Sequence, residues 1–597
     1  MTGFVNLLTG TTPSRPQWRG ADSPLVEWAL TVRQSEPFVS LQLPAAHSQL
    51  LNSAIRNAGS PAGQPGWGAS PQFEIPTTIP VAVLSSPTSR FTIAAMPRKI
   101  SRREFVGVTV AGAAIAAGPK LSPAQTRRPN ILFILADDLG YGDLSCYGRP
   151  DYQTSNLDRL ARDGVRFVNA YSASPVCTPT RCAFITGRYP ARTRVGLEEP
   201  LHEKSILRDK VETLGLSPEH PTIASLLKAN GYETALIGKW HLGYLPKFGP
   251  VQSGFEEFFG IMSGAVDFFT HKDMEGEGDL YEGKVPVERI GYLTNLLTTR
   301  AVEYISRRGQ RDEREGGSRP FYLSLHYTAP HWPWEGPTDI AVSRALGRGY
   351  DGFTASGSLK TYTAMMKSLD DGIGEVLGAL AKADLDRSTL VIFTSDNGGE
   401  RFSYNWPFRG QKFSLYEGGI RVPAIVRWPG VVPPSRVSEQ TSITMDWTAT
   451  ILAAGQTKPD PGFPLDGDDL LPIIIGGRSR GFRSQIVDPK SQISASRATD
   501  SGESSSRVTD TGGRDSRATY DRTFFWRNSN QDAVRRGRWK YLNDGTREYL
   551  FDLSIDQREQ ANFREQNPAM FNQLRNEFQK WQSQVLPRPP SRPPRSL

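Results

Sequence analysis

A cysteine stands in a polar setting in the stretch SASPVCTPTRCAFITGRYP, residues 172–190. This residue, Cys177, is flanked by Thr, Pro and Arg, whereas a cysteine that only packs in a core behaves as a small hydrophobe and usually lies in an apolar run. Pro179 suits the first turn of a helix, and Arg181 adds a permanently charged guanidinium group. A helix N-terminus beside a fixed cation favours an anion, or a nucleophile that attacks one. Cys177 is therefore a candidate nucleophile.

Hard oxygen ligands occur at two places that are far apart in the chain. Asp137 and Asp138 follow the apolar run 131–135, and Asp396 and Asn397 follow the apolar run 389–394. Either pair alone is typical of a helix cap or a tight turn. Taken together, carboxylate and amide oxygens without a soft ligand suit Ca²⁺ or Mg²⁺ better than Zn²⁺. We therefore predict that these four residues share one divalent metal ion.

A second set of residues supplies positive charge and proton transfer, namely Arg181, Lys239, His241, His331 and Lys412. Around a divalent metal, this set suits a tetrahedral oxyanion and its transfer. A histidine at a strand end is often only structural. His326 alternates with the core face of its strand, and we assign it to the core for this reason. The residues alone leave the reaction open, because a plain thiolate suits acyl transfer better than sulfuryl or phosphoryl transfer beside a hard metal.

The elements that must position these residues follow a regular alternation. Near-continuous apolar strands alternate with helices from about residue 130 to about residue 471, which predicts an α/β fold with a mostly parallel sheet sandwiched by helices. We expect a helix capped by Ser155, one strand over 165–177, and a strand over 320–331 that ends at His331. Each polar cluster comes just after the carboxyl end of a predicted strand, which is where open α/β sheets place their ligand crevice. We therefore expect the clusters to converge in space.

The alternation stops after the catalytic region, which we place at residues 128–475. Residues 520–586 predict three short strands and an amphipathic helix, hence a smaller C-terminal antiparallel sheet plus helix subdomain. Between the two lies 476–519, rich in Ser, Arg, Thr and Gly, which predicts a disordered insertion. Residues 587–597 form a Pro/Arg-rich tail.

The positive charge of the chain lies at its ends. The formal net charge is +8, of which +5 falls in residues 1–120 and +3 in residues 587–597, so the remainder is neutral. A nucleic-acid binder needs a basic field over its folded part, so we expect no nucleic-acid partner. The chain has only three cysteines, too few for a disulfide framework.

The first part of the chain predicts export. Residues 1–95 are of low complexity, and we interpret them as a mis-annotated extension before a true start at Met96. Residues 96–127 contain SRREFV followed by a short apolar stretch, 105–117, which is similar to a bacterial twin-arginine signal peptide. That stretch is too short for a stable membrane span. The expected location is therefore periplasmic or secreted, with the twin-arginine translocation machinery as a partner.

Six blocks, in order, resemble the sulfatase family. They are PNILFILADDLGYGDLSCYG, CTPTRCAFITGRYP, GKWHLG, APHWPW, TSDNGG and KFSLYEGGIRVPAIVRWPG. The second is similar to the family signature Cys-x-Pro-Ser/Thr-Arg. The resemblance covers about residues 128–475 and implies an arylsulfatase-like, formylglycine-dependent type I sulfatase with an alkaline-phosphatase-like fold.

The resemblance implies a role for each candidate. Cys177 would be oxidised to formylglycine by a formylglycine-generating enzyme, and its hydrated aldehyde would attack sulfur. Asp137, Asp138, Asp396 and Asn397, with residue 177, would hold one Ca²⁺. Arg181 would support residue 177, Lys239 and Lys412 would bind sulfate oxygens, His331 would donate a proton and His241 would accept one.

The implied activity is hydrolysis of an aryl or carbohydrate sulfate ester to an alcohol and sulfate. Two rival functions stay open: a phosphoester or phosphonate hydrolase of the same superfamily, and an inactive sulfatase-like binding protein. The family's additional polar group has three candidates here, Ser263, Asp267 and Thr270. Three tryptophans near the expected site could stack on a sugar ring or pack a loop with equal ease, namely Trp332, Trp334 and Trp406.

Overall fold

The computed structural model describes residues 128–198, 200–201, 213–315, 319–476 and 522–589. Its centre is a ten-stranded sheet with the strand order β11-β2-β10-β9-β1-β8-β4-β5-β6-β7. The strands are β1 (Asn130–Ala136), β2 (Val165–Phe167), β4 (Glu233–Gly238), β5 (Glu257–Ile261), β6 (Leu280–Glu282), β7 (Val285–Pro286), β8 (Phe321–His326), β9 (Thr389–Ser395), β10 (Ala424–Arg427) and β11 (Arg436–Ser438). The five adjacent strands β9, β1, β8, β4 and β5 are parallel, which confirms the predicted mostly parallel sheet.

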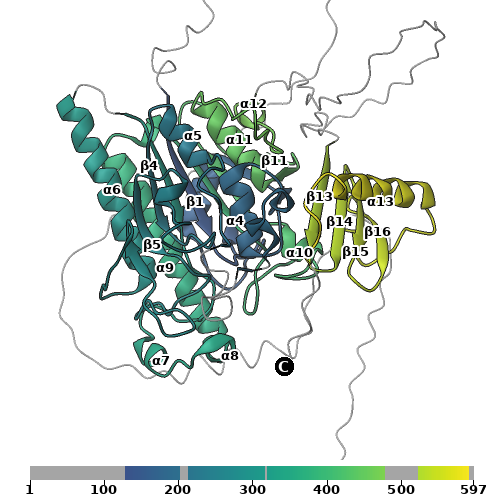
Figure 1. Cartoon of the computed structure of the whole chain (residues 1–597), viewed down its shortest axis with the longest axis horizontal. Helices are drawn as coiled ribbons and strands as arrows, with labels where there is room; N and C mark the ends of the chain where they lie inside the picture. The colour runs from purple at the N-terminus through teal and green to yellow at the C-terminus, as the bar shows by residue number, and fades with distance from the viewer. Residues whose placement is uncertain (1–127, 199, 202–212, 316–318, 477–521, 590–597) are drawn as a thin grey trace, which may run out of the picture. The chain divides into compact units, whose positions relative to one another are not determined.

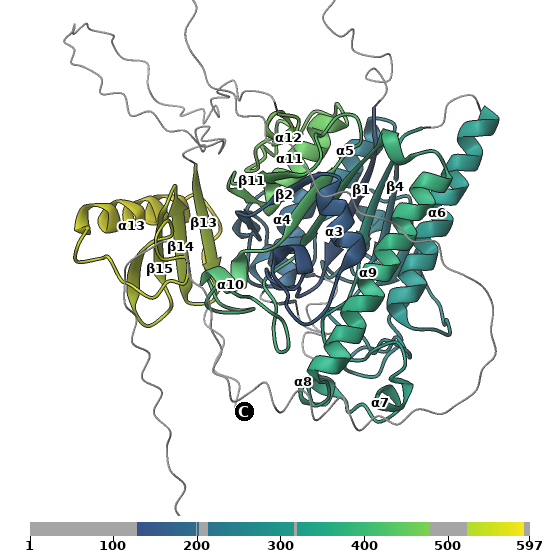
Figure 2. The ribbon, with the colours of Figure 1, turned by 180° about the vertical axis from the view of Figure 1, so that it is seen from behind.

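The central strand β1 explains why the sheet is covered on both faces. Alternate side chains of a strand point to opposite faces. Leu132 and Ile134 enter one apolar cluster, and Ile131 and Phe133 enter another. The first cluster includes side chains of α3 (Ser155–Arg162), α6 (Leu293–Glu315) and α9 (Leu359–Lys382), and the second includes those of α4 (Cys177–Thr186), α5 (Ile223–Ala229), α11 (Thr444–Ala454) and α12 (Leu471–Ile474). Figures 1 and 2 show these two helical layers from opposite sides.

A separate four-stranded antiparallel sheet follows the large one (Figure 1). It contains β13 (Thr523–Asn528), β14 (Gln531–Arg536), β15 (Trp539–Asn543) and β16 (Glu548–Asp552), and α13 (Pro568–Gln582) packs on it. The subdomain was predicted with three strands, which is wrong by one. The remaining α-helices and strands of the described residues are α7 (Ile340–Arg344), α8 (Gly349–Thr354), α10 (Glu417–Ile420) and the paired strands β3 (Ala170–Tyr171) and β12 (Ser442–Ile443).

Three boundaries differ from the sequence predictions. The N-cap of α3 is Thr154, so Ser155 is the first residue of the helix. The predicted strand over 165–177 is divided into β2 and β3, because β2 pairs with β10 and β11 whereas β3 pairs with β12. Strand β8 ends at His326, and His331 lies in the segment that follows it.

Several predictions fall outside the described residues. They are the extension 1–95, the signal peptide 96–127, nearly all of the insertion 476–519 and most of the tail 587–597. Within the described part of the chain, no helix has the length and apolar character needed to cross a bilayer.

Candidate active site

The polar candidates meet at the carboxyl ends of the central strands. Asp137 and Asp138 follow β1, Lys239 follows β4, and Asp396 follows β9. Lys239 Nζ lies 2.6 Å from Asp137 Oδ2, and Lys412 Nζ lies 2.6 Å from Asp138 Oδ2. All five side chains are buried. The convergence expected from the topology therefore brings these residues together from four separate segments of the chain.

Helix α4 contributes the cation that joins the carboxylates. Arg181 donates from Nε and Nη2 to Asp396 Oδ2, at 3.0 and 2.8 Å, and its Nη2 lies 3.4 Å from Asp137 Oδ1. Arg181 is fully buried, so its charge needs these partners. The carboxylates of Asp137, Asp138 and Asp396 thus lie among three cations, Arg181 and the two lysines.

Cys177 is the first residue of α4, and Pro179 lies in the first turn, as expected. The thiol is buried, with 2% of the residue exposed. Burial raises the pKa of the Cys177 thiol, against the lowering effect of Lys239 and Lys412. The group is therefore a neutral thiol at neutral pH, which disfavours the reading of Cys177 as an unmodified thiolate nucleophile.

The donor atoms fit a hard divalent cation. Asp137 Oδ1 and Asn397 Oδ1 are buried and accept no hydrogen bond within the described residues. Asn397 Nδ2 donates to Asp138 Oδ1 at 2.7 Å, which ties the two predicted ligand pairs together. One ligand atom each from Asp137, Asp138 and His331 lies within 4.8 Å of the others. Buried oxygens that accept no hydrogen bond are what a Ca²⁺ ion would satisfy.

The carboxylate pKa values also favour a bound cation at this cluster. Burial raises the pKa of Asp138 to about 7, against the lowering effect of Lys412. Burial also raises the pKa of Asp396 to about 6, and the charge of Asp137 adds to the effect. Burial acts on Asp137 as well, but Lys239 and Arg181 hold its pKa below the ordinary value. A bound cation would stabilise the charged forms of the first two carboxylates.

The two predicted catalytic histidines have different proton arrangements. His241 Nε2 lies 2.9 Å from Leu201 O, so Nε2 carries the proton and the buried Nδ1 keeps a lone pair without a partner in the described chain. His331 Nδ1 donates to Trp332 O at 2.6 Å, and its Nε2 faces Lys412 Nζ at 3.1 Å. Burial lowers the pKa of both rings well below the ordinary value, reinforced by Lys239 at His241 and by Lys412 at His331. Both rings are therefore neutral.

A family profile described as sulfatase matches residues 129–457, more than half of the chain. The chain belongs to the sulfatase family. N-acetylgalactosamine-6-sulfatase of Canis lupus familiaris is 34% identical over 368 residues, which cover 59% of this chain and 66% of the dog protein. Arylsulfatase A of Homo sapiens is 34% identical over 384 residues, covering 61% of this chain and 70% of the human protein. The chain thus spans just under two thirds of the dog relative.

Two solved structures share the fold. The crystal structure of Ps i-CgsB in complex with k-i-k-neocarrahexaose superimposes with a TM-score of 0.61 at 27% identity, covering 76% of this chain and 93% of that one. PsFucS1 sulfatase from Pseudoalteromonas sp. has a TM-score of 0.57 at 23% identity, covering 81% of this chain and 94% of that one. The alkaline-phosphatase-like architecture expected from the resemblance is therefore confirmed.

One member of the cluster in this sulfatase-family chain was not predicted. Glu400 Oε2 lies 3.6 Å from Lys412 Nζ and accepts a hydrogen bond from Trp332 Nε1 at 3.1 Å. The signal was its place directly after TSDNGG, four residues beyond Asp396. Its carboxylate gives Lys412 a second acidic neighbour beside Asp138.

The candidates for the family's additional polar group make hydrogen bonds to neighbouring residues. Ser263 Oγ donates to Ala265 O at 3.0 Å, and Asp267 Oδ1 accepts from Thr270 N at 2.6 Å. Trp332 and Trp334 are buried, which favours their packing role. Trp406 is 50% exposed, with the Arg558 guanidinium 4.6 Å from its ring centroid, so it stays the candidate for stacking on a sugar.

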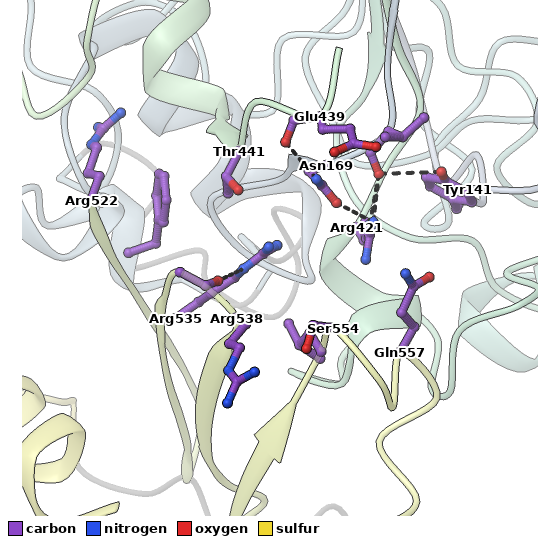
Figure 3. Close-up of a pocket in the computed structure, with 14 residues that line it drawn as sticks. Tyr141, Asn169, Arg421, Glu439, Thr441, Arg522, Arg535, Arg538, Ser554 and Gln557 are labelled. Atoms are coloured by element: carbon purple, nitrogen blue, oxygen red, sulfur yellow. Dashed lines mark hydrogen bonds between the residues drawn. The ribbon is translucent and has the colours of Figure 1, made fainter. Parts of the chain in front are cut away.

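A cavity of about 400 Å³ is lined by none of the predicted site residues (Figure 3). Arg421 borders it from the end of α10, and Arg522, Arg535 and Arg538 border it from the C-terminal subdomain. These guanidinium groups already have partners: Arg421 Nε donates to Val168 O at 3.0 Å, and Arg522 Nη1 donates to Asp446 Oδ1 at 2.6 Å. The cavity is therefore lined by paired arginines, unlike the candidate site, where two buried oxygens accept no hydrogen bond in the described residues.

Proposed function

We propose that this protein hydrolyses a sulfate ester to an alcohol and sulfate, with formylglycine made from Cys177 and with one Ca²⁺. The observation that carries the proposal is Cys177 within a complete CTPTR motif, at a buried helix start where the charges of Lys239, Lys412, Asp137 and Asp396 act on the thiol. The raised pKa of the thiol supports a modified residue over a thiolate. When present, the hydrated aldehyde would supply an oxygen nucleophile. When bound by Asp137, Asp138, Asp396 and Asn397, Ca²⁺ would supply positive charge.

The lysines would hold the transferring group. Lys239 and Lys412 each lie 2.6 Å from a carboxylate, so their ammonium groups are fixed before any substrate arrives. Cations oriented in a buried site stabilise the negative charge on sulfate oxygens without reorganising during the reaction. Arg181 would keep Asp396 and Asp137 in place, since it bonds one and lies beside the other.

The histidines would move the protons. The free lone pair at His241 Nδ1 suits a general base, which would take a proton from the hydrated residue 177. His331 Nε2 accepts from Lys412 as found, so its role as the acid requires a proton at that atom. The negative charge of a bound sulfate ester would favour that proton. The ester bond between sulfur and the leaving oxygen would then break with protonation of that oxygen.

The substrate class that we propose is a sulfated carbohydrate, with aryl sulfates as further substrates. The dog relative is named for a sulfated N-acetylgalactosamine, and Ps i-CgsB was crystallised with a neocarrahexaose. The exposed Trp406 ring offers a surface on which a sugar could stack.

The test uses protein from a host with the formylglycine-generating enzyme. Mass spectrometry of the tryptic peptide 167–181 should give the mass of an aldehyde in place of the thiol. Hydrolysis of 4-nitrophenyl sulfate should exceed that of 4-nitrophenyl phosphate. A faster phosphate reaction would instead identify a phosphoester hydrolase, and an unmodified thiol without turnover would identify a binding protein.

We also propose that the protein is exported to the periplasm or secreted by the twin-arginine machinery. The support is the SRREFV motif ahead of a short apolar stretch. N-terminal sequencing of the native precursor should begin at Met96, and mature protein should lack the motif. A precursor with residues before Met96 would contradict this start, and mature protein that retains SRREFV would contradict signal cleavage.

A further inference from the structure

We propose that Gln531 and Asn528 of the C-terminal subdomain are positioning residues, which fix the backbone next to Lys412 and so hold its ammonium group in the active site. The catalytic role of Lys412 rests on the proposed function, whereas its position can be tested without turnover. The two residues end β13 and begin β14, more than one hundred residues after Lys412 in the chain.

The backbone after Lys412 has a conformation that needs support. Phe413 has φ of 70°, in the left-handed region that a bulky side chain rarely adopts. Its N–H donates to Pro175 O at 2.9 Å, two residues before Cys177. Its carbonyl accepts from Gln531 Nε2 at 2.8 Å and from Asn528 Nδ2 at 3.2 Å. The residue is thus held from one side by the nucleophile's own segment and from the other by the C-terminal sheet.

The same amide holds a second point of the segment. Gln531 Oε1 accepts from Leu415 N at 2.9 Å, so one side chain bridges two backbone groups. Further along, Glu417 N donates to Glu559 Oε2 at 2.6 Å. Three C-terminal side chains therefore fix the backbone from Phe413 to Glu417.

This fixed backbone begins at Phe413, directly after Lys412. Nζ of Lys412 lies 2.6 Å from Asp138 Oδ2 and 3.1 Å from His331 Nε2. A long lysine side chain has many rotamers, so its reach into the cluster depends on where its Cα is held. The bonds of Gln531 and Asn528 go to the backbone beside Lys412, so their effect on the reaction would pass through that residue.

The first test measures kcat and KM for 4-nitrophenyl sulfate in Gln531→Ala. We expect kcat/KM to fall about tenfold, as for the loss of a hydrogen-bonded support near a reacting group. Gln531→Glu keeps an acceptor for Leu415 N but loses the donor to Phe413 O, so we expect a similar fall. The matched control is Gln573→Ala, an exposed glutamine on α13 of the same subdomain, which should retain wild-type kinetics. Wild-type kinetics in Gln531→Ala would overturn the proposal.

A double-mutant cycle separates positioning from general destabilisation. In a Lys412→Ala background, Gln531→Ala should cause no further fall in kcat/KM, because the group that it positions is gone. A full additional tenfold fall in that background would show that Gln531 acts independently of Lys412.

A crystal structure of Gln531→Ala gives a readout without turnover. We expect the segment from Phe413 to Leu415 to shift and Lys412 Nζ to leave Asp138. Unchanged Lys412 contacts in that structure would overturn the proposal, even if the wild-type protein proved to have no sulfatase activity. Conversely, a wild-type protein without turnover would refute the proposed function, but it would leave the positioning role of Gln531 to be decided by this structure.

Discussion

The protonation state of Cys177 bears on whether the nucleophile is a thiolate or a modified residue. A buried thiol with a raised pKa is a poor thiolate, which supports the proposed oxidation of Cys177 over a thiolate nucleophile. We predict that Cys177→Ala lowers kcat for 4-nitrophenyl sulfate by roughly 10³-fold or more, because a covalent nucleophile is removed. The measurement is steady-state kinetics on protein with verified residue 177 chemistry. The control is Cys146→Ala, since Cys146 is a partly buried free thiol outside the cluster and should be dispensable. Equal activity of both variants would contradict the assignment.

The buried oxygens of Asp137 and Asn397 that accept no hydrogen bond in the described residues lead to a prediction about calcium. Added Ca²⁺ should raise the thermal midpoint of chelator-treated protein. At a free Ca²⁺ concentration of one hundred times the dissociation constant, the free energy of unfolding should rise by about 2.7 kcal/mol. The shift should be lost in Asp138→Asn, which removes one hard anionic ligand. Calorimetric scans with Ca²⁺ and with chelator check this. An equal Ca²⁺ shift in the variant would place the ion elsewhere.

Residues of the candidate site were predictable where a side chain with metal-binding or catalytic chemistry directly follows a predicted strand. Asp137, Asp138, Asp396 and Asn397 follow apolar strands, and topology alone brings such residues together. Gln531 and Asn528 carried no comparable signal, because their importance depends on a hairpin docking against a backbone carbonyl far away in the chain. An amide that bonds to backbone has no sequence motif.

Strands β4 and β8 meet so closely beside the site that only glycine fits between them. Gly238, which precedes Lys239, has φ of 116°, and a Cβ there would lie 1.8 Å from His326 O. The same His326 carbonyl accepts from Lys239 N at 2.9 Å. The close approach of the two strands therefore sets the position of Lys239.

We predict that Gly238→Ala destabilises the protein by about 3 kcal/mol and lowers activity, because the strands must separate and the conformation is strained. Thermal denaturation and kinetics measure the two effects. Gly378→Ala is the matched control, since nothing lies within 4 Å of a Cβ at that position in α9. That substitution should be neutral or stabilise the helix by roughly 0.5–1 kcal/mol. A Gly238→Ala protein as stable as the wild type would refute the steric argument.

The elements themselves were predictable to different degrees. The long amphipathic α9 and the apolar β9 follow their sequence patterns closely. The expected strand over 165–177 failed because its apolar run serves two pairings, with β2 in the large sheet and β3 beside β12. Which partner a strand takes is decided by distant segments, and a local pattern does not contain that information.

The catalytic region and the C-terminal subdomain are joined by buried charges. Lys540 Nζ, from β15, lies 2.9 Å from Glu417 Oε1 and 2.8 Å from Glu559 Oε1, and all three residues are fully buried. Burial acts to raise the pKa of Glu417, but Lys540 and Arg421 lower it to about 2. The folded state therefore binds a proton at Glu417 less readily than the unfolded chain does.

This linkage has a defined pH window. A carboxyl with a depressed pKa stabilises the fold above its ordinary pKa, near 4.5, and loses that contribution as the pH falls toward 2. We predict that Glu417→Gln costs about 3 kcal/mol at pH 7, where Lys540 loses a buried partner, and that its deficit relative to the wild type shrinks below pH 4.5. Thermal midpoints of both proteins from pH 3 to pH 7 test this. A deficit that stays constant across the range would contradict the assigned pKa.

The burial of Cys177 limits the time during which an enzyme could modify this residue. An enzyme that oxidises this residue needs access to a side chain of which 2% is exposed once α4 is packed. If Cys177 is oxidised as we propose, oxidation would compete with folding, and a chain that folds first would retain its thiol. The specific activity of a purified sample would then depend on the rate of Cys177 oxidation relative to the rate of folding in the producing cell. It would rise when folding is slowed, but not when more of the oxidising enzyme is added to the folded protein.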